Sequence, residues 1–243
     1  MCGRYAMASS QEEIVAFFNV TENDSNPTLP LNWNIAPTNE IYIVRDQDRE
    51  SHQRILDTAS WGLIAPWQKN FADARAGQSH AINARSESIH EKPTFRDAFR
   101  TSRCLIPATG YYEWATSLGK YPPKQPFYIS HEDGSPLTIA GICNTWVSEK
   151  GEVIQSASII TREAVDELAT IHSRMPVFMP RDRWQEWCDP NNREITYLQS
   201  LMQVVNPTSG LVTRPVSPRV NIVANNGPSI IDEYELGEPQ TLF

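Results

Sequence analysis

RCLIPATGYYEWA, residues 103–115, decides the fold class of this chain of 243 residues. Aliphatic and aromatic residues fill both halves of the stretch, 103–108 and 110–115, and predict two short β-strands. Three similar runs follow along the chain: 126–130, 136–146 and 152–160. Asp133-Gly134 is typical of a hairpin turn and predicts that two of these strands form a hairpin. The centre of the chain is therefore β-rich.

Helical patterns surround this centre. Ser10-Gln11-Glu12-Glu13 is a capping box followed by apolar residues, which predicts a helix over residues 10–19. Lys92-Pro93-Thr94 opens a second helix that continues to about residue 102. The other expected elements are a strand at 40–45, helices near 180–188 and 193–203, and a strand around 212–217. The order of elements predicts an α+β fold with a curled, mostly antiparallel, barrel-like sheet and flanking helices.

We expect one domain over residues 1–230 and a loose acidic tail over 231–243. No apolar run approaches the ~20 residues that a membrane helix needs. The N-terminal segment lacks the apolar core of a signal peptide. These features predict a soluble, cytoplasmic protein (nucleoid-associated if the source is bacterial) that is a monomer and has no membrane partner.

The charge pattern leaves nucleic-acid binding open. The net charge of −8 argues mildly against it, yet sixteen of the 21 basic residues are arginines, whose planar guanidinium fits phosphate bidentately. Arg96, Arg100 and Arg103 fall at i, i+4 and i+7 and would share one side of the helix that starts near Pro93. That side is either a solvated face or part of a phosphate track.

Three of the four cysteines have no pattern of chemical significance. Cys104, Cys143 and Cys188 are isolated, with no C-x-x-C and no Cys/His cluster at zinc spacing. We predict that they are small buried side chains. The sequence therefore indicates no disulfide framework, no metal site and no cofactor.

Cys2 differs, because removal of Met1 would place a free α-amine beside its thiol. The reference pKa values of the two groups are about 8 and about 8.5, so both are partly nucleophilic near neutral pH. Such a residue condenses with an aldehyde to a Schiff base and then closes a thiazolidine ring. Two alternatives remain: an N-terminal nucleophile hydrolase, and an incidental residue in a frayed terminus.

Other polar residues form candidates for the same site. Asn83 and Arg85 are two apart on an extended segment and would project together, toward a sugar hydroxyl and a phosphate, or into solvent. Glu113 lies among aromatic residues, which would raise its pKa and suit it to proton transfer; a structural glutamate is the alternative. His172, in a loop before a proline, could relay protons.

Two segments rich in proline and tryptophan could stack unpaired bases. They are NWNIAPT at 32–38 and SWGLIAPW at 60–67. Most of the tryptophans are expected to pack in the core, whereas Trp67 is expected at the surface.

Taken together, the segments resemble the SRAP family, the SOS-response-associated peptidases, which include abasic-site shielding proteins. The similar stretches run in family order: MCGRYA at 1–6, NWNIAPT at 32–38, SWGLIAPW at 60–67, INARSES at 82–88, RCLIPATGYYEW at 103–114, KQPFYI at 124–129, AGICNTW at 140–146, IHSRMP at 171–176 and VSPRVN at 216–221. They cover nearly the whole chain, and MCGR at the start is highly specific.

The resemblance implies an SRAP-type domain with a positively charged groove for single-stranded DNA. Cys2 would form the thiazolidine crosslink, Asn83 would hydrogen-bond the opened sugar, and Glu113 would shuttle protons. His172 would assist and help to reverse the link. The matching DNA-binding positions are Arg4, Arg85 and Arg174 for phosphates, and Asn34, Pro37 and Trp67 along the DNA path.

One departure concerns the residue after Trp67. Some bacterial members have tandem tryptophans there, whereas this chain has Gln68, and the segment 68–79 is longer than usual.

Three functions are consistent with these residues. The leading one is covalent capture of abasic sites in single-stranded DNA, with abasic-site lyase as a side reaction. The alternatives are a cysteine peptidase that acts on itself or on other chains, and a non-covalent reader of modified DNA bases.

Overall fold

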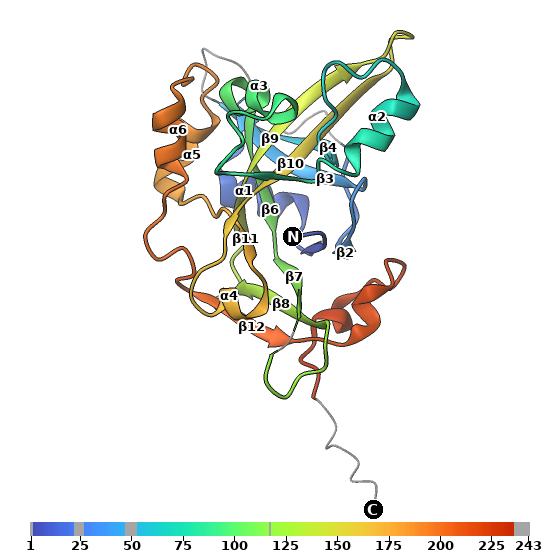
Figure 1. Ribbon diagram of the computed structural model, residues 1–243, viewed down its shortest axis with the longest axis vertical. Helices are drawn as coiled ribbons and strands as arrows, with labels where there is room; N and C mark the ends of the chain where they lie inside the picture. The colour runs from blue at the N-terminus through green and yellow to red at the C-terminus, as the bar shows by residue number, and fades with distance from the viewer. Residues whose placement is uncertain (1, 22–26, 47–52, 117, 236–243) are drawn as a thin grey trace, which may run out of the picture.

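The computed structural model describes residues 2–21, 27–46, 53–116 and 118–235, and its strands form two sheets (Figure 1). The smaller sheet has the order β12-β8-β7-β1-β2. Its strands are β1 (Tyr5–Met7), β2 (Asn32–Ile35), β7 (Gly110–Ala115), β8 (Gln125–His131) and β12 (Leu211–Pro215). All of its pairings are antiparallel.

The larger sheet closes on itself. Its strands are β3 (Glu40–Asp46), β4 (Arg54–Trp61), β5 (Asn83–Arg85), β6 (Arg103–Ala108), β9 (Leu137–Val147), β10 (Val153–Glu163) and β11 (Arg174–Pro176). The order is β11-β10-β4-β3-β6-β9, and β9 also pairs with β10, which completes a ring of strands. β10 pairs in parallel with β4 and β5, and the other pairings are antiparallel. The predicted α+β fold with a curled, mostly antiparallel, barrel-like sheet is confirmed.

Helices flank the sheets as the sequence predicted. They are α1 (Gln11–Phe18), α2 (Phe71–Gln78), α3 (Pro93–Thr101), α4 (Leu168–Ile171), α5 (Trp184–Cys188) and α6 (Ile195–Leu201), with short 3-10 turns at Arg181–Arg183, Pro218–Asn221 and Pro228–Ile231. Both hydrogen bonds of the capping box at Ser10 are present, and Pro93 opens α3. Helices α2 and α4 and strands β1, β2, β4 and β11 were not predicted. Helix α2 does have an N-cap, since the Asn70 side chain accepts a hydrogen bond from Asp73 N at 2.9 Å.

The predicted hairpin at Asp133-Gly134 is wrong. The turn itself forms: Gly134 has a φ of 75° and its N–H donates to His131 O at 3.2 Å. The strands on either side, however, enter different sheets, because β8 pairs with β7 and β12 while β9 pairs with β6 and β10. The turn therefore links the two sheets.

The prediction that Arg103 shares a helical side with Arg96 and Arg100 is also wrong. α3 ends at Thr101, and Arg103 begins β6 with 1% of its surface exposed, whereas Arg96 and Arg100 are exposed. The Arg103 guanidinium donates to carbonyls at the ends of α3 and α5, Phe99 O at 2.7 Å and Trp187 O at 2.6 Å. It also donates to the carbonyl oxygens of Asp189 and Asn192.

This arrangement explains how a charged group is tolerated inside. Carbonyls at helix C-termini lack intrahelical donors and carry partial negative charge, so one guanidinium satisfies several of them. Burial lowers the pKa of Arg103 to about 10, which still leaves it charged at neutral pH. Arg103 therefore locks α3 and the α5 region onto the larger sheet.

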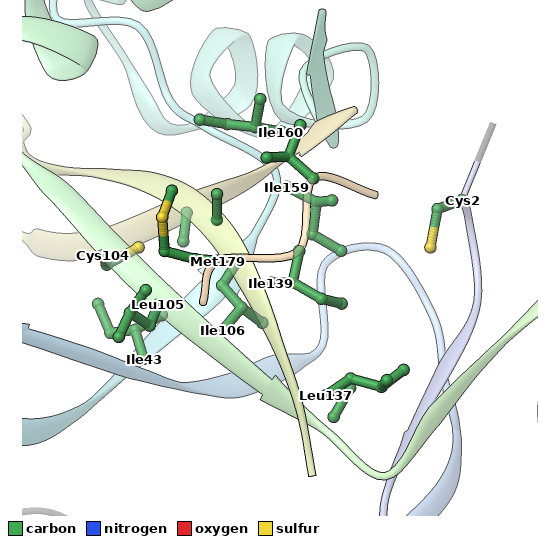
Figure 2. Packing of buried hydrophobic residues seen from close by; sticks show 14 of the residues in the cluster. Cys2, Ile43, Cys104, Leu105, Ile106, Leu137, Ile139, Ile159, Ile160 and Met179 are labelled. Carbon is green, nitrogen blue, oxygen red and sulfur yellow. The ribbon is translucent and has the colours of Figure 1, made fainter. Parts of the chain in front are cut away.

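The main hydrophobic core draws side chains from both sheets and includes all four cysteines, none of which is disulfide-bonded. The predicted burial of Cys104, Cys143 and Cys188 is confirmed. Figure 2 shows Cys2 at one end of this cluster and Cys104 at the other, with Ile139 and Ile159 between them. Cys2 is thus separated from Cys104 by apolar side chains.

Arg103→Met is expected to lower the free energy of unfolding by about 3 kcal/mol, because it leaves buried carbonyls without a charged donor. Denaturant unfolding monitored by tryptophan fluorescence measures the change. Arg100→Met, which removes an exposed arginine of the same region, should change stability by no more than about 0.5 kcal/mol. Equal effects of the two substitutions would contradict the buried role of Arg103.

Candidate active site at the junction of the two sheets

Both sheets hold Cys2. β1 lies between β7 and β2 in the smaller sheet, and its pairing with β7 extends to Arg4, whose carbonyl accepts a hydrogen bond from Tyr112 N at 3.0 Å. From the larger sheet, Asn83 at the start of β5 donates from Nδ2 to Cys2 O at 2.8 Å. Cys2 is fully buried in this position. A residue that could have frayed at the chain end is instead fixed from two directions.

Glu113 lies on β7 with 3% of its surface exposed. Burial raises the pKa of this carboxyl to about 7, as its aromatic surroundings in the sequence predicted. Its Oε2 is 3.9 Å from Nδ1 of His172, the residue that follows α4. A carboxyl with a pKa near neutrality exchanges protons readily in both directions, which suits general acid–base chemistry.

His172 is oriented by the main chain. Its Nδ1 lies 3.0 Å from Arg174 N and 3.2 Å from Arg174 O, so the main chain of Arg174 holds the ring in place. Burial lowers the pKa of His172, and the ring is therefore neutral at pH 7. The 3.9 Å between His172 Nδ1 and Glu113 Oε2 is longer than a hydrogen bond, so the ring lies near the carboxyl without bonding to it through these two atoms.

The Cys2 thiol needs a base. Burial raises its pKa above the usual value, and the charge of Glu113 raises it further. The thiol is therefore protonated at neutral pH, and thiolate formation requires a group that accepts its proton. Glu113 is the carboxylate whose charge acts on this thiol, which makes it the candidate base.

Asn83 and Arg85 lie on one side of β5, as predicted, with Ala84 buried between them. Asn83 Oδ1 is buried and has no hydrogen-bond partner among the described residues. It therefore offers a free acceptor beside Cys2. Arg85 is exposed on the rim.

Arg4 and Asn34 bind protein groups in this structure. Arg4 Nη1 donates to Asn34 Oδ1 at 2.7 Å and to Val220 O at 2.8 Å. Asn34 is 1% exposed, and its Nδ2 donates to the carbonyls of Val220, Ile222 and Asn225. The amide of Asn34 therefore faces the segment after Pro218 rather than solvent, and holds that segment against β1 and β2.

The two proline and tryptophan segments are buried over most of their length and reach the surface at their ends. Trp67 is 52% exposed, which confirms its predicted position. Pro37 is half-buried in the turn after β2, and the next residue, Thr38, donates to Trp61 O at 2.8 Å. This bond ties the two segments together.

Gln68, which stands where some relatives of the family have a second tryptophan, packs toward α2. Its carbonyl accepts a hydrogen bond from Trp146 Nε1 at 2.8 Å. The longer segment 68–79 thus forms the unpredicted helix α2 and its link to β9, and Trp67 is left as an isolated exposed ring.

Sequence reasoning missed three residues near the site. Tyr5 and Tyr111 are buried, and both interact electrostatically with the Cys2 thiol. Glu87 pairs with Arg174, at 2.7 and 2.9 Å. The alternation of Arg85 and Glu87 on one extended segment is the signal that could have indicated a charge cluster.

The comparisons with known proteins fit this geometry. The family profile described as SOS response associated peptidase (SRAP) matches residues 1–223. The chain belongs to the SRAP family. The abasic site processing protein YoqW of Bacillus subtilis is 32% identical over 96% of this chain and 100% of its own length. The abasic site processing protein HMCES of Gallus gallus is 30% identical over 80% of this chain and 62% of its own length.

Solved structures share the SRAP fold. A crystal structure of a protein from Bacteroides thetaiotaomicron superposes with a TM-score of 0.83 at 24% identity, over 96% of this chain and all of its own. One from Bordetella bronchiseptica gives a TM-score of 0.73 at 27% identity, over 89% of this chain and all of its own.

Within the described ranges, no three or more His, Cys, Asp and Glu side chains are grouped so that they could hold a metal ion. Nor does any helix there have the length and hydropathy to cross a membrane.

Glu113→Gln should change how stability depends on pH. The pKa of Glu113 is about 7 when folded and about 4.5 when unfolded, so the folded state binds more protons between these values. Wild-type stability should therefore fall, by up to about 3 kcal/mol, as pH rises from 5 to 8. Denaturant unfolding should show a smaller fall in Glu113→Gln. The exposed Glu91→Gln serves as the charge control, and a wild-type-like fall in Glu113→Gln would contradict the buried carboxyl.

Proposed function

We propose that this protein captures abasic sites in single-stranded DNA covalently through Cys2, once Met1 has been removed. One observation carries the proposal: Cys2 is held by Asn83 beside a buried carboxyl, Glu113, whose pKa of about 7 suits proton transfer. The names of the relatives, abasic site processing proteins, support the substrate class. An abasic site supplies an aldehyde when its sugar ring opens.

The chemistry begins at the α-amine of Cys2. The amine attacks the C1′ aldehyde to form a carbinolamine, Glu113 gives a proton to the departing hydroxyl, and one water leaves as the Schiff base forms. Glu113, now ionised, takes the proton of the Cys2 thiol. The thiolate adds to the carbon of the protonated Schiff base, whose nitrogen keeps its proton and becomes the neutral N–H of the ring. One C–N and one C–S bond have formed, and a thiazolidine closes.

The surrounding residues position the sugar. The free acceptor Asn83 Oδ1 would bind a hydroxyl of the opened sugar, and His172, in contact with Glu113, would pass protons to and from it. The same contact would also assist reversal of the link. A Schiff base at C1′ promotes β-elimination of the 3′ phosphate, so abasic-site lyase is the expected side reaction.

The DNA backbone would follow the rim of the site. Arg85 is exposed there, and Arg4 and Arg174 would contact phosphates close to Cys2. Trp67 would stack on a base with Pro37 beside it. Asn34 would act indirectly, because its amide holds the segment after Pro218. Because the net charge of the protein is −8, DNA would bind only at this local surface.

A second candidate is removal of Met1 by the protein itself. Glu113 and His172 beside a cysteine also fit attack on a peptide bond. Self-removal would connect the peptidase name of the family with the capture reaction, because it produces the free α-amine that the capture requires.

Wild-type protein mixed with an oligonucleotide that carries one abasic site should give a heat-stable conjugate on a denaturing gel. Cys2→Ala should give none, because the thiazolidine needs the thiol. Cys143→Ala is the matched control, since it removes another buried cysteine, and should leave the conjugate unchanged.

The controls separate the alternatives. Absence of a wild-type conjugate, or an undiminished one with Cys2→Ala, would contradict covalent capture. Binding of modified-base DNA that survives Cys2→Ala and needs no aldehyde would favour a non-covalent reader. Cys2-dependent cleavage of an unrelated peptide would favour a general peptidase.

Glu113→Gln should slow conjugate formation by about 10²- to 10⁴-fold, the usual contribution of a general acid–base group. The wild-type rate should change across pH 7, where Glu113 titrates, and the variant should lose that inflection. Single-turnover assays between pH 5 and pH 9 measure both. An inflection retained in Glu113→Gln would assign the titration to another group.

A further inference from the structure

An anion site beside the candidate active site is already occupied by one of the protein's own carboxylates. Arg174, on β11, donates from Nη1 to Glu87 Oε1 at 2.7 Å and from Nη2 to Glu87 Oε2 at 2.9 Å. The backbone N–H of Glu163 donates to the same Oε1 at 3.3 Å. Two parallel guanidinium bonds and a main-chain N–H are also the donors that bind a phosphate oxygen pair.

The two partners differ in how firmly they are held. The side chain of Arg174 is 15% exposed and also donates to Thr161 O at 2.7 Å, so it keeps its place without Glu87. The side chain of Glu87 is 52% exposed, and its hydrogen bonds within the described part of the chain are all made in this one site. The cation is therefore fixed, and the anion can swing into solvent.

The site is continuous with the residues proposed to act on DNA. Arg174 N donates to His172 Nδ1, and Thr161 pairs with Arg85 across β10 and β5. The Arg174 Nε is buried and has no hydrogen-bond partner among the described residues. Attachment of Arg174 to Glu87 also lowers the pKa of that carboxyl, which is ionised at neutral pH.

We propose that Glu87 is an internal substitute for a DNA phosphate: it occupies the Arg174 site in the free protein and is displaced by a backbone phosphodiester of single-stranded DNA. This rests on the proposed function. Undamaged strands must compete with Glu87 and have no aldehyde with which to form a covalent link. They are therefore bound weakly and released, while an abasic strand is retained by its bond to Cys2.

Glu87→Gln tests this, because it keeps the shape of the side chain and removes its charge. The probe is a fluorescein-labelled undamaged single-stranded oligonucleotide, and the readout is fluorescence anisotropy at low and at physiological salt. The variant should bind about 3- to 10-fold more tightly than wild type at low salt, with a smaller gain at high salt. Glu91→Gln removes an equal charge from the same segment and should gain less than 2-fold.

A second variant distinguishes displacement of Glu87 by a phosphate from a role of Glu87 in holding Arg174 in place. Arg174→Gln should weaken binding, and adding Glu87→Gln to it should then give no more than the Glu91→Gln gain. Weaker or unchanged binding by Glu87→Gln alone would show that the carboxylate merely holds Arg174, and would overturn the proposal. A gain that persists without Arg174 would overturn it as well.

The proposed function is judged separately with an abasic oligonucleotide. Wild-type protein that binds the undamaged strand but forms no conjugate with the abasic one would contradict capture and leave the displacement result standing. Wild-type protein that binds neither strand would contradict both.

Discussion

The hydrogen bond from Asn83 Nδ2 to Cys2 O, 2.8 Å long, is the contact on which the site depends. It connects a residue just before β1, in the smaller sheet, to β5, which pairs with β10 in the larger one. The two sheets contribute different residues to the site. β7 of the smaller sheet carries Glu113, and β5 of the larger sheet carries Asn83. His172 lies just before β11 of the larger sheet. The site therefore exists only where the two sheets meet, and a shift of either would separate the amide from Cys2.

Burial then determines the chemistry at that junction. Loss of hydration raises the pKa of both acidic groups, the Cys2 thiol and the Glu113 carboxyl, and the charge of Glu113 raises the pKa of the thiol further. A carboxyl with a pKa near neutrality both gives and accepts protons, which dehydration followed by thiol addition requires. The basic groups differ: Arg174 binds the Glu87 carboxylate through two guanidinium hydrogen bonds, while burial lowers the pKa of His172. His172, near the proposed proton-transfer group, and Arg174, which binds an anion, are therefore only two positions apart in the sequence.

Local patterns in the sequence predicted the elements that depend on local physics. The capping box at Ser10, the proline that opens α3 and the β-rich runs are all present, because caps, turns and strand propensity act within a few residues. Long-range pairing was not predictable in this way. The Asp133-Gly134 turn leads into a different sheet, and Arg103 continues a helical charge pattern yet is buried by carbonyls of residues more than 80 positions away. The candidate residues near Cys2 were predicted from their residue types and from the resemblance to the family. The hydrogen bonds of Asn34 and the pairing of Glu87 with Arg174 could be seen only in the folded structure.

Counting free thiols in the purified conjugate tests covalent capture by Cys2 most directly. The chain has four cysteines, and denaturing alkylation followed by intact-mass analysis should label all four in the free protein. The account predicts one label fewer in the DNA conjugate, with the missing label at Cys2, and a conjugate mass equal to protein without Met1 plus oligonucleotide minus one water. Four labels in the conjugate would show that no C–S bond forms, and a conjugate that retains Met1 would show that the α-amine of Cys2 is not the nucleophile. Either result would contradict thiazolidine formation.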